Sequence, residues 1–132
     1  MQTAIVLVSH YEPLAIALKD MIEQLVTINT DLFSIFQSAG TKDKELGTNP
    51  IKILNQLKAL EDFDQIYVFC DMGSAYLSSQ TALNFLSEEW QDKITIYEAP
   101  FVEGSYYCAI QCSLGKDRVE IEKAMNKHYD KR

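Results

Sequence analysis

The stretch Ala4-Ile5-Val6-Leu7-Val8-Ser9-His10-Tyr11-Glu12-Pro13 decides the fold of this chain. An unbroken apolar run such as residues 4–8 is typical of a parallel strand that is buried on both faces, and Pro13 suits the first turn of a helix. A strand is therefore predicted over residues 3–8, with a helix starting near Pro13. His10 lies between the two, at the carboxyl end of the strand, where open α/β sheets bind their ligands.

The rest of the chain repeats this alternation of strand and helix. Short apolar runs bounded by turn residues favour strands, and apolar residues spaced three and four apart favour helices. Further strands are predicted over residues 32–36, 66–70 and 94–97, and helices over 13–25, 49–60, 74–86 and 104–114. This alternation predicts an α/β fold with a mainly parallel four-stranded sheet and helices on both faces. If the first strand lies next to the third, with the second outside it, the sheet is doubly wound in the order 2-1-3-4. Residues 116–132 favour a helix, with a short strand as the alternative.

Composition limits the classes of function. The chain has 132 residues, of which 47% are hydrophobic and 23% charged, as expected for one domain over residues 1–132. Its net charge of -7 argues against nucleic-acid and membrane partners, because phosphate backbones are bound by clustered Lys and Arg. There is neither a membrane-spanning stretch nor a signal-peptide pattern, so we expect a cytoplasmic protein. The three cysteines lack a zinc-type spacing, and no metal site is predicted.

The candidate chemistry lies in the four loops that follow the strands. His10 ends the first strand, residues 39–48 form the second loop, Asp71 ends the third strand, and residues 99–104 form the fourth loop. Parallel strands place all four loops at one edge of the sheet. In the order 2-1-3-4 the chain reverses direction between the strands that carry His10 and Asp71, so a crevice is expected between these two side chains.

The residue types at this crevice indicate a site for an anionic group. Asp71 is expected to accept a hydrogen bond from Nδ1 of His10, which leaves Nε2 free as a nucleophile or base. The N–H groups at the start of the helix after Asp71, together with the second loop, can hold a phosphoryl group. The candidate phosphoryl-binding residues are Ser9, Gly47, Thr48, Gly73 and Ser74.

Four motifs carry a resemblance to a known family. They are Ile5 to His10, Ala39 to Thr48, Asp71 to Ala75 and Ala99 to Gly104. In order and spacing, over roughly residues 3–115, they resemble the dihydroxyacetone-kinase branch of the mannose-class enzyme IIA family of the phosphotransferase system (PTS). Two positions depart from the family pattern: Ala39 stands where glycine is often found, and Asn49 where serine is common. These departures affect loop contacts and leave the histidine and the aspartate intact.

The resemblance implies a phosphorylation cycle and its partners. It implies that the histidine phosphocarrier protein HPr phosphorylates His10, that Asp71 orients the imidazole, and that the chain forms a homodimer. The phosphoryl group would then pass to ADP on the ADP-binding kinase subunit, so no cofactor is expected on this chain. That subunit, with the dihydroxyacetone-binding subunit, would make dihydroxyacetone phosphate.

Other interpretations stay open from the sequence. An enzyme IIA component of a mannose-class sugar permease would also be phosphorylated on His10, but would pass the group to a IIB partner. The loop at residues 99–104 resembles the dihydroxyacetone branch, whereas the mannose branch typically has an Asn-Leu-Pro type loop. A non-catalytic regulatory module would bind an anion in the crevice without modification of His10. Individually, Asp71 and Ser74 also fit helix caps, and Thr48 fits a turn residue.

Overall fold

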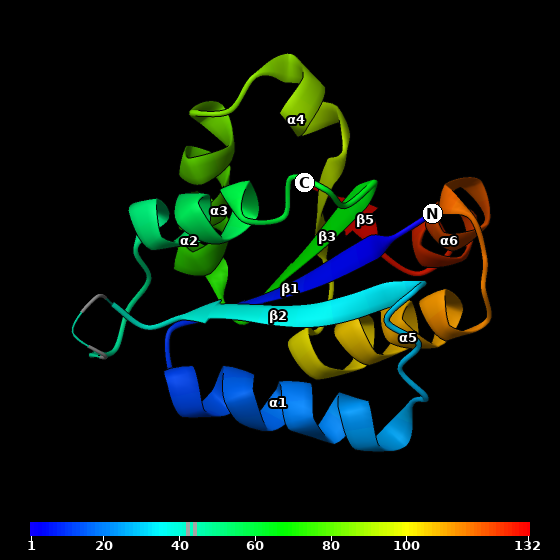
Figure 1. Ribbon diagram of the computed structural model, residues 1–132. Coiled ribbons are helices and arrows are strands. Elements are labelled where there is room, and N and C mark those ends of the chain that lie inside the picture. The colour runs from blue at the N-terminus through cyan, green and yellow to red at the C-terminus, as the bar shows by residue number, and fades with distance from the viewer. Residues whose placement is uncertain (42, 44) are drawn as a thin grey trace.

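The central sheet has five strands in the order β2-β1-β3-β4-β5 (Figure 1). The computed structural model describes residues 1–41, 43 and 45–132. Its strands are β1 (Thr3–Ser9), β2 (Phe33–Ala39), β3 (Gln65–Cys70), β4 (Ile94–Glu98) and β5 (Asp130–Lys131). Strands β1 to β4 are parallel, and β5 pairs antiparallel with β4. The predicted order 2-1-3-4 and the doubly wound α/β architecture are therefore confirmed, and β5 extends the sheet by one short strand.

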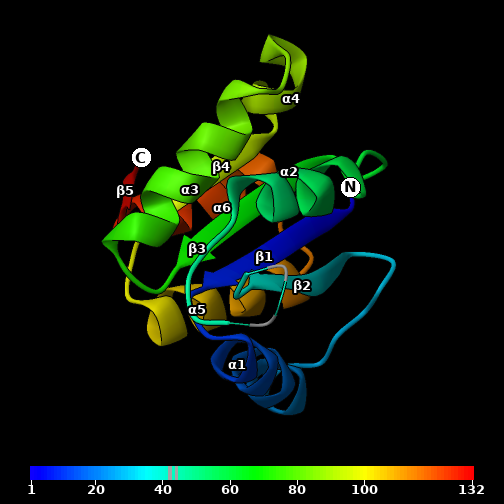
Figure 2. The same ribbon diagram turned by 90° about the vertical axis from the view of Figure 1, so that its left-hand side faces the viewer.

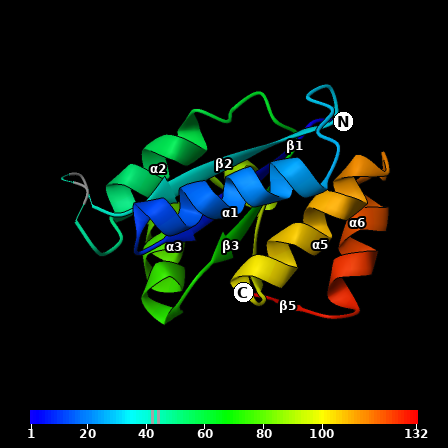
Figure 3. The same cartoon turned by 90° about the horizontal axis from the view of Figure 1, so that it is seen from below.

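Helices cover both faces of this sheet. They are α1 (Glu12–Leu25), α2 (Pro50–Lys58), α3 (Gly73–Asn84), α4 (Glu88–Asp92), α5 (Phe101–Ser113) and α6 (Arg118–Asn126). α2 and α3 lie on one face, and α1 and α5 lie on the other (Figure 1). Seen from below, α1, α5 and α6 follow one another across that second face (Figure 3). No helix in the described part of the chain has the length and apolar character needed to cross a bilayer.

The two faces of β1 supply the centres of two hydrophobic clusters. Val6 and Val8 pack in the cluster beneath α2 and α3, whereas Ile5 and Leu7 pack in the cluster beneath α1, α5 and α6. All seven residues of β1 are buried. The apolar run at residues 4–8 is thus explained, because a strand covered on both faces has no solvent side on which to alternate polar residues.

Some element boundaries differ from the sequence prediction. β2 continues to Ala39, because Gln37 and Ser38 keep their register with Leu7 and Val8 of β1 although their side chains are polar. α5 begins at Phe101, directly after Pro100, so Gly104 lies inside the helix. α4 was not predicted, and neither was β5. The helix favoured for residues 116–132 is confirmed as α6, which Asp117 starts with a capping box.

A glycine fixes the packing of α5 against β3 and β4. A Cβ on Gly104 would lie 2.6 Å from the Cβ of Ala99 and 3.5 Å from the ring of Phe69. Both neighbours sit at the edge that carries Asp71. The approach of α5 to the sheet therefore requires the absence of a side chain at this position.

We expect Gly104→Ala to lower the free energy of unfolding by about 1–3 kcal/mol, because the added methyl group overpacks this contact. Urea denaturation measures the loss. Gly73→Ala is the matched control, since a Cβ there meets no atom within 4 Å. Equal stability of the Gly104→Ala variant and the wild type would contradict the packing argument.

Candidate functional site

The site lies where β1 and β3, neighbours in the sheet, reach their carboxyl ends. His10 follows β1 and Asp71 follows β3, and the Asp71 N–H donates a hydrogen bond to the carbonyl of Val8. Figure 2 shows the loops after β1, β2 and β3 on the side of the molecule that faces the viewer. The structure therefore brings His10 and Asp71 together at the topological switch point, as the strand order predicts.

Asp71 accepts three hydrogen bonds from the end of β1. Its Oδ1 lies 2.8 Å from Nδ1 of His10, and its Oδ2 accepts from the His10 backbone N–H (3.0 Å) and the Ser9 hydroxyl (2.9 Å). The Asp71 side chain is only 8% exposed. Since the carboxylate is an acceptor, it selects the tautomer with the proton on Nδ1, and the lone pair lies on Nε2.

The hydrogen bonds also set the charge of Asp71. Burial by itself raises the pKa of this carboxyl, but the hydrogen bonds from His10 and Ser9 outweigh burial, so the pKa lies below its usual value. Asp71 is therefore ionised at neutral pH. An ionised partner on Nδ1 stabilises positive charge that develops on the imidazole when Nε2 forms a new bond.

Nε2 of His10 faces the start of α3. The ring nitrogen contacts the hydroxyl of Ser74, the second residue of the helix. The N-cap residue Met72 makes no side-chain cap, so the leading N–H groups of α3 are available beside Nε2. Nothing fills the space beside Gly73 where a side chain would lie, which leaves the backbone open to an approaching anion. The predicted residues Gly73 and Ser74 thus lie beside Nε2 of His10.

The loop after β2 holds the other side of His10. The Gly40 N–H donates to the carbonyl of Ser9 (3.0 Å), and the Gly47 N–H donates to the carbonyl of His10 (2.8 Å). Both glycines have positive φ, 72° and 129°, which side-chain-bearing residues rarely adopt. Of the predicted loop over residues 39–48, residues 42 and 44 lie outside the described residues.

Two predicted phosphoryl-binding residues make other contacts. Ser9 is completely buried, and its hydroxyl donates a hydrogen bond to Oδ2 of Asp71. We therefore assign Ser9 the role of orienting the Asp71 carboxylate. The hydroxyl of Thr48 lies 2.6 Å from the hydroxyl of Ser78 on α3. Sequence reasoning missed Ser78, although its position one helical turn after Ser74 was a usable signal.

The thiol nearest the site is not reactive. Cys70 precedes Asp71, but burial raises its pKa to about 12, and its Sγ lies 3.6 Å from the hydroxyl of Ser79. It is therefore a neutral core residue at physiological pH. Cys108 and Cys112 are buried as well, as the sequence predicts.

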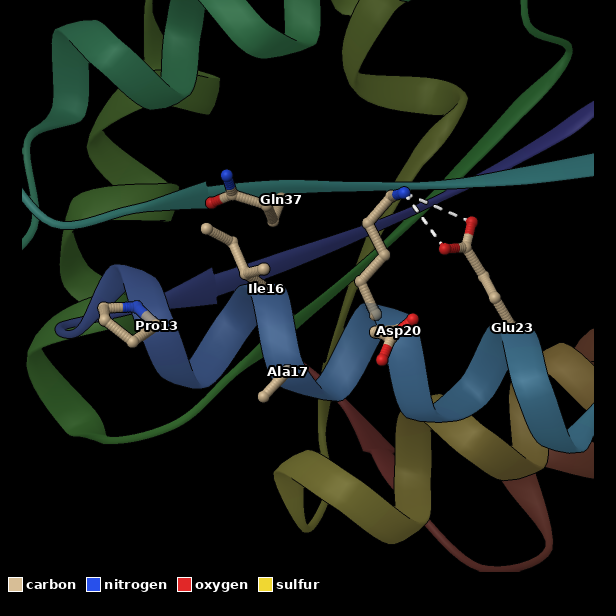
Figure 4. Close-up of a pocket in the computed structure, with 7 residues that line it drawn as sticks. Pro13, Ile16, Ala17, Asp20, Glu23 and Gln37 are labelled. Carbon is tan, nitrogen blue, oxygen red and sulfur yellow. Dashed lines mark hydrogen bonds and ion pairs between the residues drawn. The ribbon is translucent and has the colours of Figure 1, made fainter.

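A surface groove lies elsewhere, between α1 and the edge strand β2 (Figure 4). Ile16 of α1 and Gln37 of β2 face each other across it. Glu23 forms an ion pair with Lys19, and Asp20 accepts a hydrogen bond from the neutral amide of Gln24. Among the described residues, the lining of this groove holds no histidine, cysteine or serine, in contrast to the crevice at His10.

Several apolar side chains are exposed in the part of the chain that forms the edge of the sheet at His10. They lie in the loops after the strands or in the first two turns of the following helices: Tyr11, Leu46, Ile51, Met72, Leu77 and Val102. Exposed apolar groups around a polar centre are typical of surfaces that bind other proteins.

Comparisons with known proteins agree with this fold. The family model described as "PTS system fructose IIA component" (EIIA-man) matches residues 4–122. A solved structure of a protein of unknown function has 33% sequence identity and a TM-score of 0.85, and the match covers 100% of this chain and 98% of that chain.

Curated relatives carry more specific names. The phosphoryl donor subunit DhaM of PEP-dependent dihydroxyacetone kinase 2 from Listeria innocua is 40% identical over 89% of this chain and 92% of the relative. The phosphotransferase subunit DhaM of the PTS-dependent dihydroxyacetone kinase from Lactococcus lactis is 30% identical over 96% of each chain. The Escherichia coli donor subunit is 32% identical over 86% of this chain, but the match spans only 24% of that longer protein.

We expect Asp71→Asn to lower the free energy of unfolding at pH 7 by about 1–3 kcal/mol, because an amide has one acceptor oxygen for three donors. A carboxyl group with a lowered folded pKa contributes stability above its unfolded pKa, and this stability is lost as pH falls through the folded pKa. The difference between wild type and variant should therefore shrink below about pH 4.

Urea denaturation at pH 7, 5 and 3 measures this difference. Asp62→Asn, at an exposed position, is the matched control and should change little at any pH. A cost of Asp71→Asn that stays constant from pH 7 to pH 3 would show that the three hydrogen bonds do not depend on the charge.

Proposed function

We propose that this chain, which belongs to the EIIA-man family of the phosphotransferase system, carries a phosphoryl group on Nε2 of His10. The observation that supports this proposal best is the hydrogen bond between Asp71 and Nδ1, which leaves the lone pair on Nε2 beside the start of α3. Positioned N–H groups and a helix N-terminus stabilise the negative charge of a phosphoryl group. The chain acts in this proposal as a phosphotransferase component with a phosphohistidine intermediate.

The first transfer loads His10. The Nε2 lone pair attacks the phosphorus of phosphorylated HPr in line with the bond that breaks. A new N–P bond forms on His10 while the N–P bond of the donor histidine breaks, and its electron pair stays on the donor. Asp71 holds the imidazole in position and balances its developing positive charge, so that positioning and electrostatics carry most of the catalysis.

The second transfer unloads His10. An oxygen of the terminal phosphate of ADP, bound to the ADP-binding kinase subunit, attacks the same phosphorus. The new O–P bond yields ATP on that subunit, and the electron pair of the broken N–P bond returns to Nε2. ATP then phosphorylates dihydroxyacetone on the dihydroxyacetone-binding subunit. The names of the relatives from Listeria innocua and Lactococcus lactis support this acceptor over a sugar-transport partner. ADP belongs to the partner subunit, and the chain needs no cofactor of its own.

The surroundings of His10 fit protein donors and acceptors better than small molecules. Apolar side chains such as Met72 and Leu77 are exposed next to the crevice. They have no role in binding a free phosphate, but they provide contact area for a docked protein. The proposal includes the homodimer that the family resemblance implies, which sedimentation analysis tests directly.

We expect His10→Ala to abolish phosphorylation and to leave the fold intact. The purified chain is incubated with labelled PEP, enzyme I and HPr, and then with ADP-loaded kinase subunits and dihydroxyacetone. Label that is acid-labile on His10 and then appears in dihydroxyacetone phosphate supports the proposal. A loaded wild type that fails to discharge indicates the sugar-permease function, and a wild type that does not load indicates a regulatory module.

We expect Leu77→Asp to raise the KM for phosphorylated HPr at least fivefold, because it places a charge in the docking surface. Phe85→Asp is the matched control, because Phe85 is also exposed but lies at the far end of α3. Loading by the small donor phosphoramidate should be the same for both variants and the wild type. An equal loss for both donors in Leu77→Asp would indicate damage to the site instead of lost docking.

A further inference from the structure

The hydroxyls of Thr48 and Ser78 join the two sides of the crevice. Thr48 lies in the loop after β2, Ser78 lies on α3, and their oxygens are 2.6 Å apart although the residues are 30 positions apart in the sequence. Both side chains are partly buried. We call this pair the hydroxyl clasp.

Each end of the clasp leads directly to His10. On the loop side, Thr48 follows Gly47, whose N–H donates to the carbonyl of His10. On the helix side, Ser78 lies one turn after Ser74, on the same face of α3, and Ser74 contacts Nε2. The clasp therefore links Gly47, which holds the backbone carbonyl of His10, to Ser74, which contacts Nε2 of His10.

The neighbouring bonds of the loop end tie it to β1 and α2: the Gly47 N–H donates to the carbonyl of His10, and Lys52 of α2 donates to the carbonyl of Ala39. Asn49, which follows Thr48, caps α2 through the N–H of Ile51 (2.9 Å), so it ties the chain to α2 and leaves the distance to α3 open. α2 and α3 pack against each other further along, through Leu54 and Leu83 of the same hydrophobic cluster. At the crevice itself the hydroxyl clasp is a direct side-chain bond between the loop and α3.

We propose that Ser78 is a positioning residue for phosphoryl transfer, acting through Thr48 and Gly47. The clasp holds the imidazole of His10 at a fixed distance from Ser74 and the first N–H groups of α3. Without it, the loop after β2 moves relative to α3, and the phosphoryl group on Nε2 loses alignment with its donors. The inference rests on the proposed phosphohistidine function.

The experiment compares Ser78→Ala, Thr48→Ala, their double variant and the conservative Thr48→Ser. Thr81→Ala is the matched control, because it also removes a hydroxyl from α3, one that donates to the carbonyl of Leu77 in its own helix (2.8 Å). Two quantities are measured for each protein: the rate of loading by phosphorylated HPr, and the nitrogen-15 NMR signals of the His10 ring in the unphosphorylated protein. Thermal unfolding is followed in parallel.

Each single alanine variant is expected to load about three- to tenfold more slowly, as for the loss of one hydrogen bond. The double variant should be no slower than the slower single variant, because both remove the same interaction. Thr48→Ser and Thr81→Ala should load like the wild type. The His10 ring signals should shift in both single alanine variants and stay unchanged in Thr81→Ala.

A double variant whose loading rate falls by the product of the two single-variant effects would overturn the proposal. Loading of Ser78→Ala at the wild-type rate would overturn it as well. If the wild type itself does not load, the phosphohistidine function fails, and the NMR signals still decide whether the clasp positions His10. Unshifted ring signals in Ser78→Ala and Thr48→Ala would refute the positioning role in either case.

Discussion

The structure of the site depends on one carboxylate that serves as a common acceptor for the end of β1. Asp71 receives the imidazole of His10, the backbone N–H of His10 and the hydroxyl of Ser9. These three donors fix the ring, the backbone and the strand end relative to β3. Because the carboxylate is nearly buried, its charge is screened only weakly, and the interaction orients the imidazole more strongly than a surface pair would.

The start of α3 and the loop after β2 supply further groups around His10. α3 starts directly after Asp71, so the same turn that supplies the orienting acid also supplies the helix N-terminus beside Nε2. The loop after β2 holds the His10 carbonyl from the opposite side through Gly47. Neighbouring parallel strands bring these groups to one edge, which is why a small sheet can place an oriented imidazole beside a helix N-terminus.

Most of the fold could be predicted because the segments with the clearest apolar patterns and capping residues are the strands and helices that build the core. The buried run over residues 4–8, and the capping residues Asn49 and Asp117, identified elements that tertiary packing left unchanged. The errors arose where local signals were weak or short. β2 runs on through Gln37 and Ser38 because β1 pairs with them, and α4 and β5 are too short to show a period.

The sequence by itself determined that His10 and Asp71 lie at the same edge of the sheet, since alternating strands and helices imply parallel strands. That their strands are neighbours is shown by the structure. The sequence also placed glycines in the loop after β2, and the structure gives Gly40 and Gly47 of that loop positive φ angles. Only the tertiary structure decided which side chains face the nucleophile. The Ser9 hydroxyl bonds Asp71, the Thr48 hydroxyl bonds Ser78, and the Ser74 hydroxyl contacts Nε2 of His10. A hydroxyl group can donate or accept with any polar group that lies within reach. Sequence spacing does not show which group that is.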